Sequence, residues 1–260
     1  MKIDIAVACV YFQRRLCYML SSLSQQINPP EITIDIAYQP NNGSPTTEAV
    51  IDFFLNQQLA RKEYGVHTYF AGTPNLKIRQ TLCGDEIKGK RGTVRERQLQ
   101  QSKADWILFG DCDHVYHPDF FNDLATQLAG PFKDETKCLA STRISLAKDH
   151  CKDFFNRTLP GQYPCFIPDA AQTVSTWPVY RISPAMGAGY FQMANVDRLR
   201  RDHGGHYVPP KARRDNGWHT KSDRYFRQML GGVARITTKP QYHLNHERPR
   251  EEGLPDDIQR

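Results

Sequence analysis

Short apolar runs alternate with helix-forming stretches through the first 113 residues, and this alternation constrains the fold most. The apolar runs are Ile3–Val10, Ile32–Tyr38, Val66–Phe70 and Trp106–Phe109, and the predicted helices between them are Leu16–Gln26, Thr46–Tyr64 and Val94–Lys103. Strands that alternate with helices are joined by right-handed crossovers, which predicts a mostly parallel α/β sheet flanked by helices. Ligands bind such sheets beyond the carboxyl ends of the strands. The residues directly after each apolar run are therefore candidate site residues.

The second half of the chain is less regular. We expect helices over Asp119–Leu128, Phe191–Arg201 and Ser222–Leu230, strands over Cys138–Ile144 and Val233–Thr237, and irregular structure over Leu76–Lys90 and Asp149–Pro184. No stretch has the composition of an interdomain linker, so 260 residues are expected to form a single domain.

Composition and cysteine spacing exclude several classes of protein. No run of about 18 uncharged apolar residues occurs, so no membrane span is expected. The seven cysteines are odd in number and form no C-x-x-C pair, which argues against a disulfide framework or a cysteine zinc site and favours the reducing cytoplasm. The phosphate-binding motif of kinases and the glycine fingerprint of dehydrogenases are both missing.

The positive charge is local. The formal net charge is +6, and the stretch 197–235 alone holds ten Lys or Arg against four Asp, which is also an excess of six. A basic stretch favours an anionic partner, either the phosphates of a small ligand or a nucleic-acid backbone. A solvated basic face explains the same charge equally well.

An acidic pair follows the most apolar run. Asp111 and Asp113 come directly after Trp106–Phe109, separated by Cys112. Two carboxylates at a strand end can turn toward one point, which suits a divalent cation that bridges phosphate oxygens. Acidic loops are common, and the pair gains weight mainly from its place after a predicted buried strand.

Five separated segments carry a family resemblance. They are Val7–Arg14, Asn41–Ser44, the stretch from Val94 to Asp113, Gly187–Phe191 with the later Gly204 and Gly205, and Ser222–Leu230. In order and spacing they resemble the motifs of family 2-type glycosyltransferases, which transfer a sugar from a nucleotide-sugar and have the GT-A fold. The resemblance implies a single GT-A domain, with a nucleotide-sugar-binding half (1–113) and an acceptor-binding half (114–260).

The resemblance assigns roles on the donor side. It implies that Val10 and Tyr11 flank the nucleotide base, and that Asn41 and Asn42 stand where an acidic residue usually holds the base or ribose. Arg95 is expected to face the diphosphate. Asp111 is expected near the ribose and the metal, and Asp113 as a direct metal ligand. A histidine late in the chain, His243 or His246, is expected to complete the metal site, and mixed carboxylate and imidazole ligands favour Mn²⁺ over Mg²⁺.

It also assigns a base and an acceptor side. Asp223 matches the catalytic base, which takes the proton from the acceptor hydroxyl. Without the resemblance, Asp223 is more readily explained as an acid at a helix start, favoured by the helix dipole. Gly189, Trp218, Arg213 and Arg214 are expected to contact the acceptor, although Trp218 is equally well explained as a core residue.

The expected activity is therefore metal-dependent, inverting transfer of a sugar from a donor, which we expect to be UDP-linked, to a saccharide or other hydroxyl compound. One alternative is the same chemistry on a nucleic acid, such as a hydroxymethylated pyrimidine in DNA. A second alternative is a non-catalytic module that binds nucleotide-sugars or nucleic acid. Asp111, Asp113 and Asp223 together argue against the second, because a binding module needs no base.

Overall fold

The computed structural model describes residues 1–41, 43, 45–63, 75–157, 162–186, 190–209 and 218–245. The first half contains β1 (Lys2–Cys9), α1 (Gln13–Ser24), β2 (Glu31–Tyr38), α2 (Thr47–Glu63), β3 (Leu76–Leu82), α3 (Glu86–Gly89), α4 (Arg91–Gln101) and β4 (Trp106–Gly110). The second half contains β5 (His114–Tyr116), α5 (Phe120–Ala129), β6 (Cys138–Ala140), β7 (Arg143–Leu146), α6 (Lys148–Arg157), α7 (Ala170–Ser175), β8 (Val179–Ser183), β9 (Phe191–Asn195), α8 (Val196–His203), α9 (Trp218–Met229), β10 (Val233–Arg235) and β11 (Gln241–His243).

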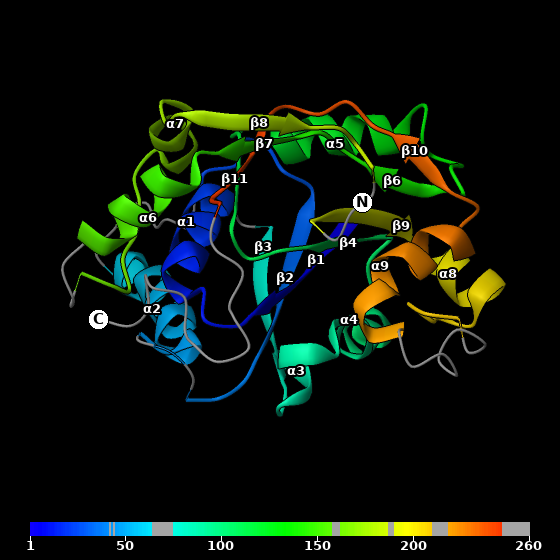
Figure 1. The fold of residues 1–260 in the computed structure, drawn as a ribbon, viewed down its shortest axis with the longest axis horizontal. Helices are drawn as coiled ribbons and strands as arrows, with labels where there is room; N and C mark the ends of the chain where they lie inside the picture. Colours follow the sequence, from blue (N-terminus) through cyan, green and yellow to red (C-terminus); the bar gives the residue numbers. More distant parts are fainter. Residues whose placement is uncertain are drawn as a thin grey trace.

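A seven-stranded sheet forms the centre of the molecule, in the order β10-β6-β9-β4-β1-β2-β3 (Figure 1). β1 pairs in parallel with β2 and β4, and β2 pairs in parallel with β3. β9 is antiparallel to both of its neighbours, β4 and β6. The mixed α/β sheet predicted from the sequence is confirmed. Its parallel part places the ends of β1, β2 and β4 at one edge.

Alternation along β4 divides the core into two layers. Trp106 and Leu108 pack with α1, α2 and α5, whereas Ile107 and Phe109 pack with α4, α8 and α9. Successive side chains of a strand point to opposite faces, so a strand that is apolar throughout must be covered on both sides. Figure 1 shows α1 and α2 on one side of the sheet and α4, α8 and α9 on the other.

A second sheet of four strands, β5-β11-β7-β8, lies beside the first. β11 is antiparallel to β5, with His243 opposite His114, and parallel to β7. α6 and α7 cover this sheet through an apolar cluster that includes Phe155, Val174 and Leu244. The small sheet therefore brings the end of the described chain back to the segment that follows β4.

The structure corrects four of the expected elements. Leu76–Lys90, expected to be irregular, forms β3 and α3, and the first five residues of the helix expected over Phe191–Arg201 form β9. Cys138–Ile144 is divided between β6 and β7, which belong to different sheets. Asp149–Pro184 contains α6, α7 and β8. The strand expected over Val66–Phe70 lies outside the described residues.

Among the helices that the structure describes, none has both the length and the apolar character needed to cross a bilayer.

Candidate functional site

The predicted donor residues lie at the carboxyl edge of the parallel strands. Val10 and Tyr11 follow β1, Asn41 follows β2, and Asp111 follows β4. Tyr11 and Asn41 both have left-handed backbones, with φ of 64° and 57°. A left-handed residue turns the chain sharply after a strand, which is a conformation that asparagine tolerates better than tyrosine. The structure therefore brings these four residues to one edge of the sheet, as the resemblance implied.

Asp113 and His243 lie together, although 130 residues separate them in the sequence. His243 Nε2 is 3.2 Å from Asp113 Oδ2, and His114 Nδ1 is 3.1 Å from Asp113 Oδ1. The antiparallel pairing of β11 with β5 sets this arrangement, because it places His243 opposite His114. Burial lowers the pKa of His243, although Asp113 opposes the shift. A neutral imidazole beside a carboxylate is a donor pair that suits a divalent transition metal.

Asp223 is held in a buried polar cluster. Arg95 Nη1 donates to Asp223 Oδ1 at 2.6 Å and to the Tyr207 hydroxyl at 2.6 Å. The Tyr207 hydroxyl lies 2.9 Å from Asp223 Oδ1 and 2.5 Å from Gln192 Oε1. Gln192 Nε2 donates to the main-chain oxygen of Asp223 at 2.9 Å. Arg95 from α4 and Tyr207 from the segment after α8 thus hold the carboxylate of Asp223, and Gln192 from β9 holds its main-chain oxygen.

Arg95 links this cluster to Asp111. Its Nη2 atom is 3.7 Å from Asp111 Oδ1, and Arg91 Nη1 is 3.8 Å from the same oxygen. Burial by itself lowers the pKa of Arg95, but Tyr207, Asp223 and Asp111 raise it above its ordinary value. The guanidinium therefore stays charged between the expected donor side and the expected base. Its contact with the diphosphate stays a prediction.

Several residues of the site were not found from the sequence. They are His114, beside Asp113, and Gln192 and Tyr207, beside Asp223. For His114, the only available signal was that it directly follows Asp113 in the sequence. Gln192 and Tyr207 reach Asp223 only through tertiary packing, which a single sequence does not reveal.

Some predicted site residues lie outside the described residues. These are Asn42, Gly189, Arg213, Arg214 and His246. α9 begins at Trp218, whose side chain is not described. In the parts of the chain that are described, no cluster of three or more His, Cys, Asp or Glu side chains has the arrangement of a metal site.

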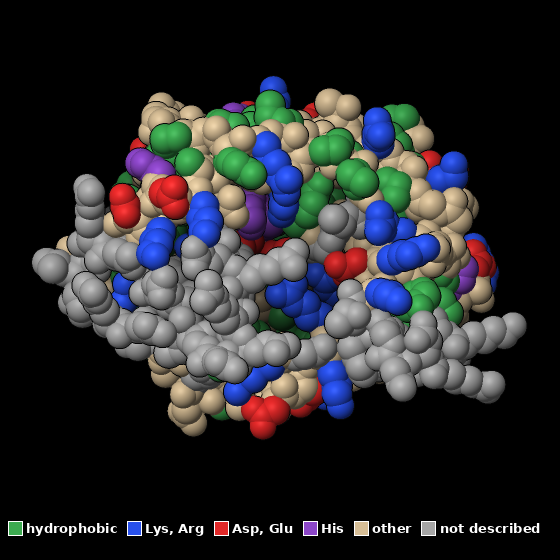
Figure 2. Space-filling model, in the orientation of Figure 1, with side chains coloured by type: hydrophobic (Ala, Val, Ile, Leu, Met, Phe, Trp, Pro, Cys, Tyr) green, Lys and Arg blue, Asp and Glu red, His purple; other side chains and the backbone are tan. Residues whose placement is uncertain are grey.

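Figure 2 shows a hollow at the centre of one face of the molecule. Histidine and acidic side chains are visible at its depth, and Lys and Arg side chains lie above and below it. This distribution matches the contacts described above, in which carboxylates lie close to buried arginines. Cations around a recessed acidic site favour a ligand that carries negative charge together with a metal.

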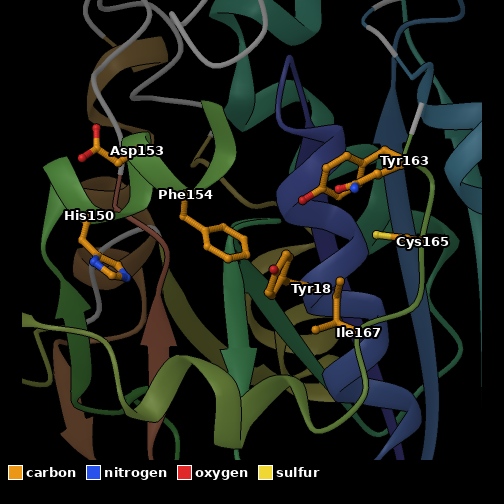
Figure 3. Close-up of a pocket in the computed structure, with 8 residues that line it drawn as sticks. Tyr18, His150, Asp153, Phe154, Tyr163, Cys165 and Ile167 are labelled. Carbon is orange, nitrogen blue, oxygen red and sulfur yellow. The ribbon is translucent and has the colours of Figure 1, made fainter. Parts of the chain in front are cut away.

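A separate cavity of about 520 Å³ lies between α1, α6 and the segment 162–167 (Figure 3). Tyr18, Phe154 and Ile167 give it an apolar wall, and His150 and Asp153 lie at its rim. None of its lining residues belongs to the clusters around Asp113 or Asp223. The predicted site residues therefore do not line this cavity.

Comparisons with known proteins identify the fold through structure and not through sequence. No protein-family model and no curated protein matches the chain. The chain is similar to the crystal structure of Staphylococcus aureus TarS, with a TM-score of 0.51 and 16% identity over 94% of this chain and 36% of that one. It is also similar to residues 1–349 of TarS in complex with UDP, with a TM-score of 0.50 and 15% identity over 93% of this chain and 60% of that one.

The chain has the GT-A fold. The fold expected from the sequence is thereby confirmed. The chain spans 36% of TarS and 60% of its 1–349 fragment. In this fold the acidic pair follows β4. The helix expected over Ser222–Leu230 begins earlier, at Trp218, so Asp223 lies inside α9 and not at its start, and the helix dipole does not explain its position.

Proposed function

We propose that the chain is a glycosyltransferase that moves a sugar from a UDP-linked donor to an acceptor hydroxyl. The observation that carries the proposal is the single charged network that joins Asp111 to Asp223 through Arg95. Arg95 contacts both Asp111, a candidate residue of the donor site, and Asp223, the candidate base. The UDP complex of TarS, which shares the fold, supports the choice of nucleotide.

The donor binds at the ends of β1, β2 and β4 in this proposal. Val10, Tyr11 and Asn41 hold the base and ribose, and Arg91 and Arg95 attract the diphosphate to the side of Asp111. Both arginines already lie within 3.8 Å of Asp111 Oδ1. An arginine guanidinium matches the geometry of phosphate oxygens, so the pair orients the diphosphate as well as attracting it.

Asp113 and His243 are the described residues that would hold a divalent metal. A divalent cation there would neutralise the charge that develops on the leaving diphosphate. A carboxylate and a neutral imidazole favour Mn²⁺ over Mg²⁺. His246 stays the alternative histidine, as predicted from the sequence.

Asp223 acts as the general base. It takes the proton of the acceptor hydroxyl as the hydroxyl oxygen attacks the anomeric carbon from the face opposite the diphosphate, so the product is inverted. Arg95, Tyr207 and Gln192 hold the carboxylate in place and limit its rotation. Burial raises the pKa of Tyr207 well above its ordinary value, although Arg95 opposes the shift, so the hydroxyl keeps its proton and can donate to the carboxylate.

Transfer to a hydroxymethylated pyrimidine in DNA is the second candidate function. The observation that favours it is the net positive charge of the stretch 197–235. A panel of UDP-sugars with Mn²⁺, scored for UDP release with and without hydroxymethylated DNA, tests both. If hydroxymethylated DNA increases the release of UDP, the second candidate function is supported. If UDP is released equally with and without DNA, the acceptor is a different compound. A protein that binds UDP-sugars without releasing UDP under any condition is the binding module considered above.

A further inference from the structure

The charges of three arginines, Arg143, Arg181 and Arg227, act on Tyr190. Arg143 lies over the ring of Tyr190, with its Cζ atom 3.9 Å from the ring centroid. The charges of Arg143, Arg181 and Arg227 all oppose the rise in the pKa of Tyr190 that burial causes. In the pairing of β7 with β8, Arg143 is opposite Ser183 and Arg181 is opposite Ser145, so Arg143 and Arg181 project from one face of the strand pair. We call these three residues the arginine cluster.

No described carboxylate neutralises the arginine cluster. None of its three members forms an ion pair with an acidic residue in the described ranges. The Nε atom of Arg143 is buried and has no hydrogen-bond partner among the described residues. Burial lowers the pKa of Arg143, although Tyr190 and the more distant Asp113 and Asp111 oppose the shift. Arg143 is half-buried, whereas Arg181 is exposed. Partial burial of a guanidinium without a paired anion is costly, which indicates that Arg143 is arranged for an anion that arrives from outside.

The arginine cluster lies between the expected metal ligand and the expected base. On one side, the Tyr190 ring stacks on His114, with centroids 6.0 Å apart, and His114 contacts Asp113. On the other side, Arg227 Nε donates to the main-chain oxygen of Asp223 at 3.2 Å, and Arg227 Nη1 donates to that of Met186 at 2.7 Å. In the proposed reaction, the acceptor hydroxyl must reach the space between these two groups.

We propose that the arginine cluster binds a phosphate group of the acceptor, so that the substrate class is a hydroxyl compound that carries phosphate near the attacking hydroxyl. This inference rests on the proposed function. The new bond joins the acceptor oxygen to the anomeric carbon, and the bond from that carbon to the donor diphosphate breaks. Asp223 receives the hydroxyl proton, and the nucleoside diphosphate leaves. The acceptor phosphate takes no part in bond making and serves to hold the acceptor.

The donor diphosphate has its own cations. Arg91 and Arg95 lie beside Asp111 and are separate from the arginine cluster. Arg91 and Arg95 contact Asp111, whereas Arg143 packs on Tyr190, and we assign the two sets to two anionic groups bound at the same time. A competition experiment distinguishes this arrangement from one in which all five arginines bind the donor diphosphate.

The test measures phosphate binding on protein that is already saturated with UDP. Inorganic phosphate and dimethyl phosphate are titrated separately by calorimetry, without divalent metal, into the wild-type chain and into Arg143→Gln, Arg143→Lys and Arg201→Gln. Arg201 is an exposed arginine of the basic stretch that pairs with Asp202, so it serves as the matched control. UDP affinity is measured separately on each variant.

We expect at least one probe to bind the UDP-saturated protein. Arg143→Gln should weaken that binding roughly tenfold or more, because a charge-assisted bidentate contact is lost. Arg143→Lys should retain part of the binding, and Arg201→Gln should match the wild type. UDP affinity should be unchanged in all variants. Preference for inorganic phosphate indicates a monoester acceptor, and preference for dimethyl phosphate indicates a diester.

Three results overturn the inference. They are the failure of both probes to bind, displacement of the probe by UDP, and equal probe affinity in the wild type and Arg143→Gln. Failure of the wild-type chain to bind UDP is a different result, which contradicts the proposed function and is read from the separate UDP titration.

Discussion

The proposed sugar transfer depends on the carboxylate of Asp223. We expect Asp223→Asn to retain UDP affinity and to lose sugar transfer by roughly 10²–10⁴-fold, because an amide has almost the same shape as the carboxylate but accepts no proton. Single-turnover transfer and a UDP titration measure the two effects separately. The exposed Asp202→Asn is the control and should transfer sugar normally.

Transfer at the wild-type rate by Asp223→Asn contradicts the role of base and leaves Asp223 as a structural partner of Arg95 and Tyr207. A product with retained anomeric configuration contradicts the inverting mechanism by itself, whatever the rate.

The Tyr207 hydroxyl positions Asp223 and does not contact the acceptor in the proposed arrangement. We expect Tyr207→Phe to lower kcat by roughly tenfold, since one hydrogen bond to a charged group is lost, and to leave KM for the donor unchanged. The ring itself should stay in place, because it stacks on Phe226 with centroids 4.6 Å apart. Steady-state kinetics together with the melting temperature distinguish a positioning effect from unfolding. An unchanged kcat contradicts the positioning role.

Some residues of the candidate site could be predicted from the sequence, and others could not. Asp111 and Asp113 follow a strand, and Asp223 lies in a segment of recognisable spacing, so the sequence singled them out as candidates. Gln192 and Tyr207 meet Asp223 only because β9 pairs with β4 in the sheet and α9 packs on the face to which Phe109 points. Arg143 reaches Tyr190 through the β7–β8 pair, which lies in a stretch expected to be partly irregular. Their roles depend on tertiary contacts that no spacing in the sequence encodes.

At the scale of elements, β3 shows how a polar segment becomes a strand of the central sheet. Arg79 donates to the buried carboxylates of Asp4 and Asp35 at 2.8 Å each. Thr81 adds a hydrogen bond to Asp35 at 2.7 Å. Three neighbouring strands are therefore joined by one charged network, and β3 follows a polar pattern that propensity alone assigns to a loop.

We expect Arg79→Met to destabilise the fold by about 3 kcal/mol or more, because two buried carboxylates lose their common partner. The same substitution at Lys77, in the same strand, is the matched control. Lys77 forms an exposed pair with Glu31 at 3.0 Å, so Lys77→Met should cost no more than about 1 kcal/mol. Urea unfolding measures both. Equal costs for the two variants would show that the buried network adds nothing to stability.

The remaining differences between expected and observed elements have one cause. Residues 191–195 and 138–140 are segments of five and three residues, and their conformation is set by pairing: β9 lies between β4 and β6. For a run this short, periodicity does not separate a strand from part of a buried helix. The longer first-half elements, which have clear periodicity, were predicted within a few residues.

At the scale of the whole molecule, the carboxyl edge of the first-half strands meets residues supplied by the second half. Asp113 gains His243 from β11, and Arg95 gains Asp223 from α9. The division into a donor half and an acceptor half stays a prediction from the sequence. It is consistent with the separation of Arg91 and Arg95 from the arginine cluster.

The predicted metal ligands, Asp113 and His243, come from the two halves of the chain. Asp113→Asn and His243→Gln should each weaken Mn²⁺-dependent binding of UDP by tenfold or more, as expected when one ligand of a small site is lost. Their UDP affinity in EDTA should equal that of the wild type. Binding is measured by calorimetry, with His117→Gln as the control histidine. If His243→Gln binds Mn²⁺ and UDP normally, the ligand from the late part of the chain is His246 or is not a histidine.

The most direct test of the account is UDP release from a panel of UDP-sugars in the presence of Mn²⁺, measured for the wild type, Asp113→Asn and Asp223→Asn. The account predicts that the wild type binds UDP and releases it from at least one sugar donor. It also predicts that Asp113→Asn loses the metal-dependent part of UDP binding, and that Asp223→Asn binds the donor but fails to transfer the sugar. A wild-type chain that neither binds UDP at millimolar concentration nor releases it from any donor contradicts the account.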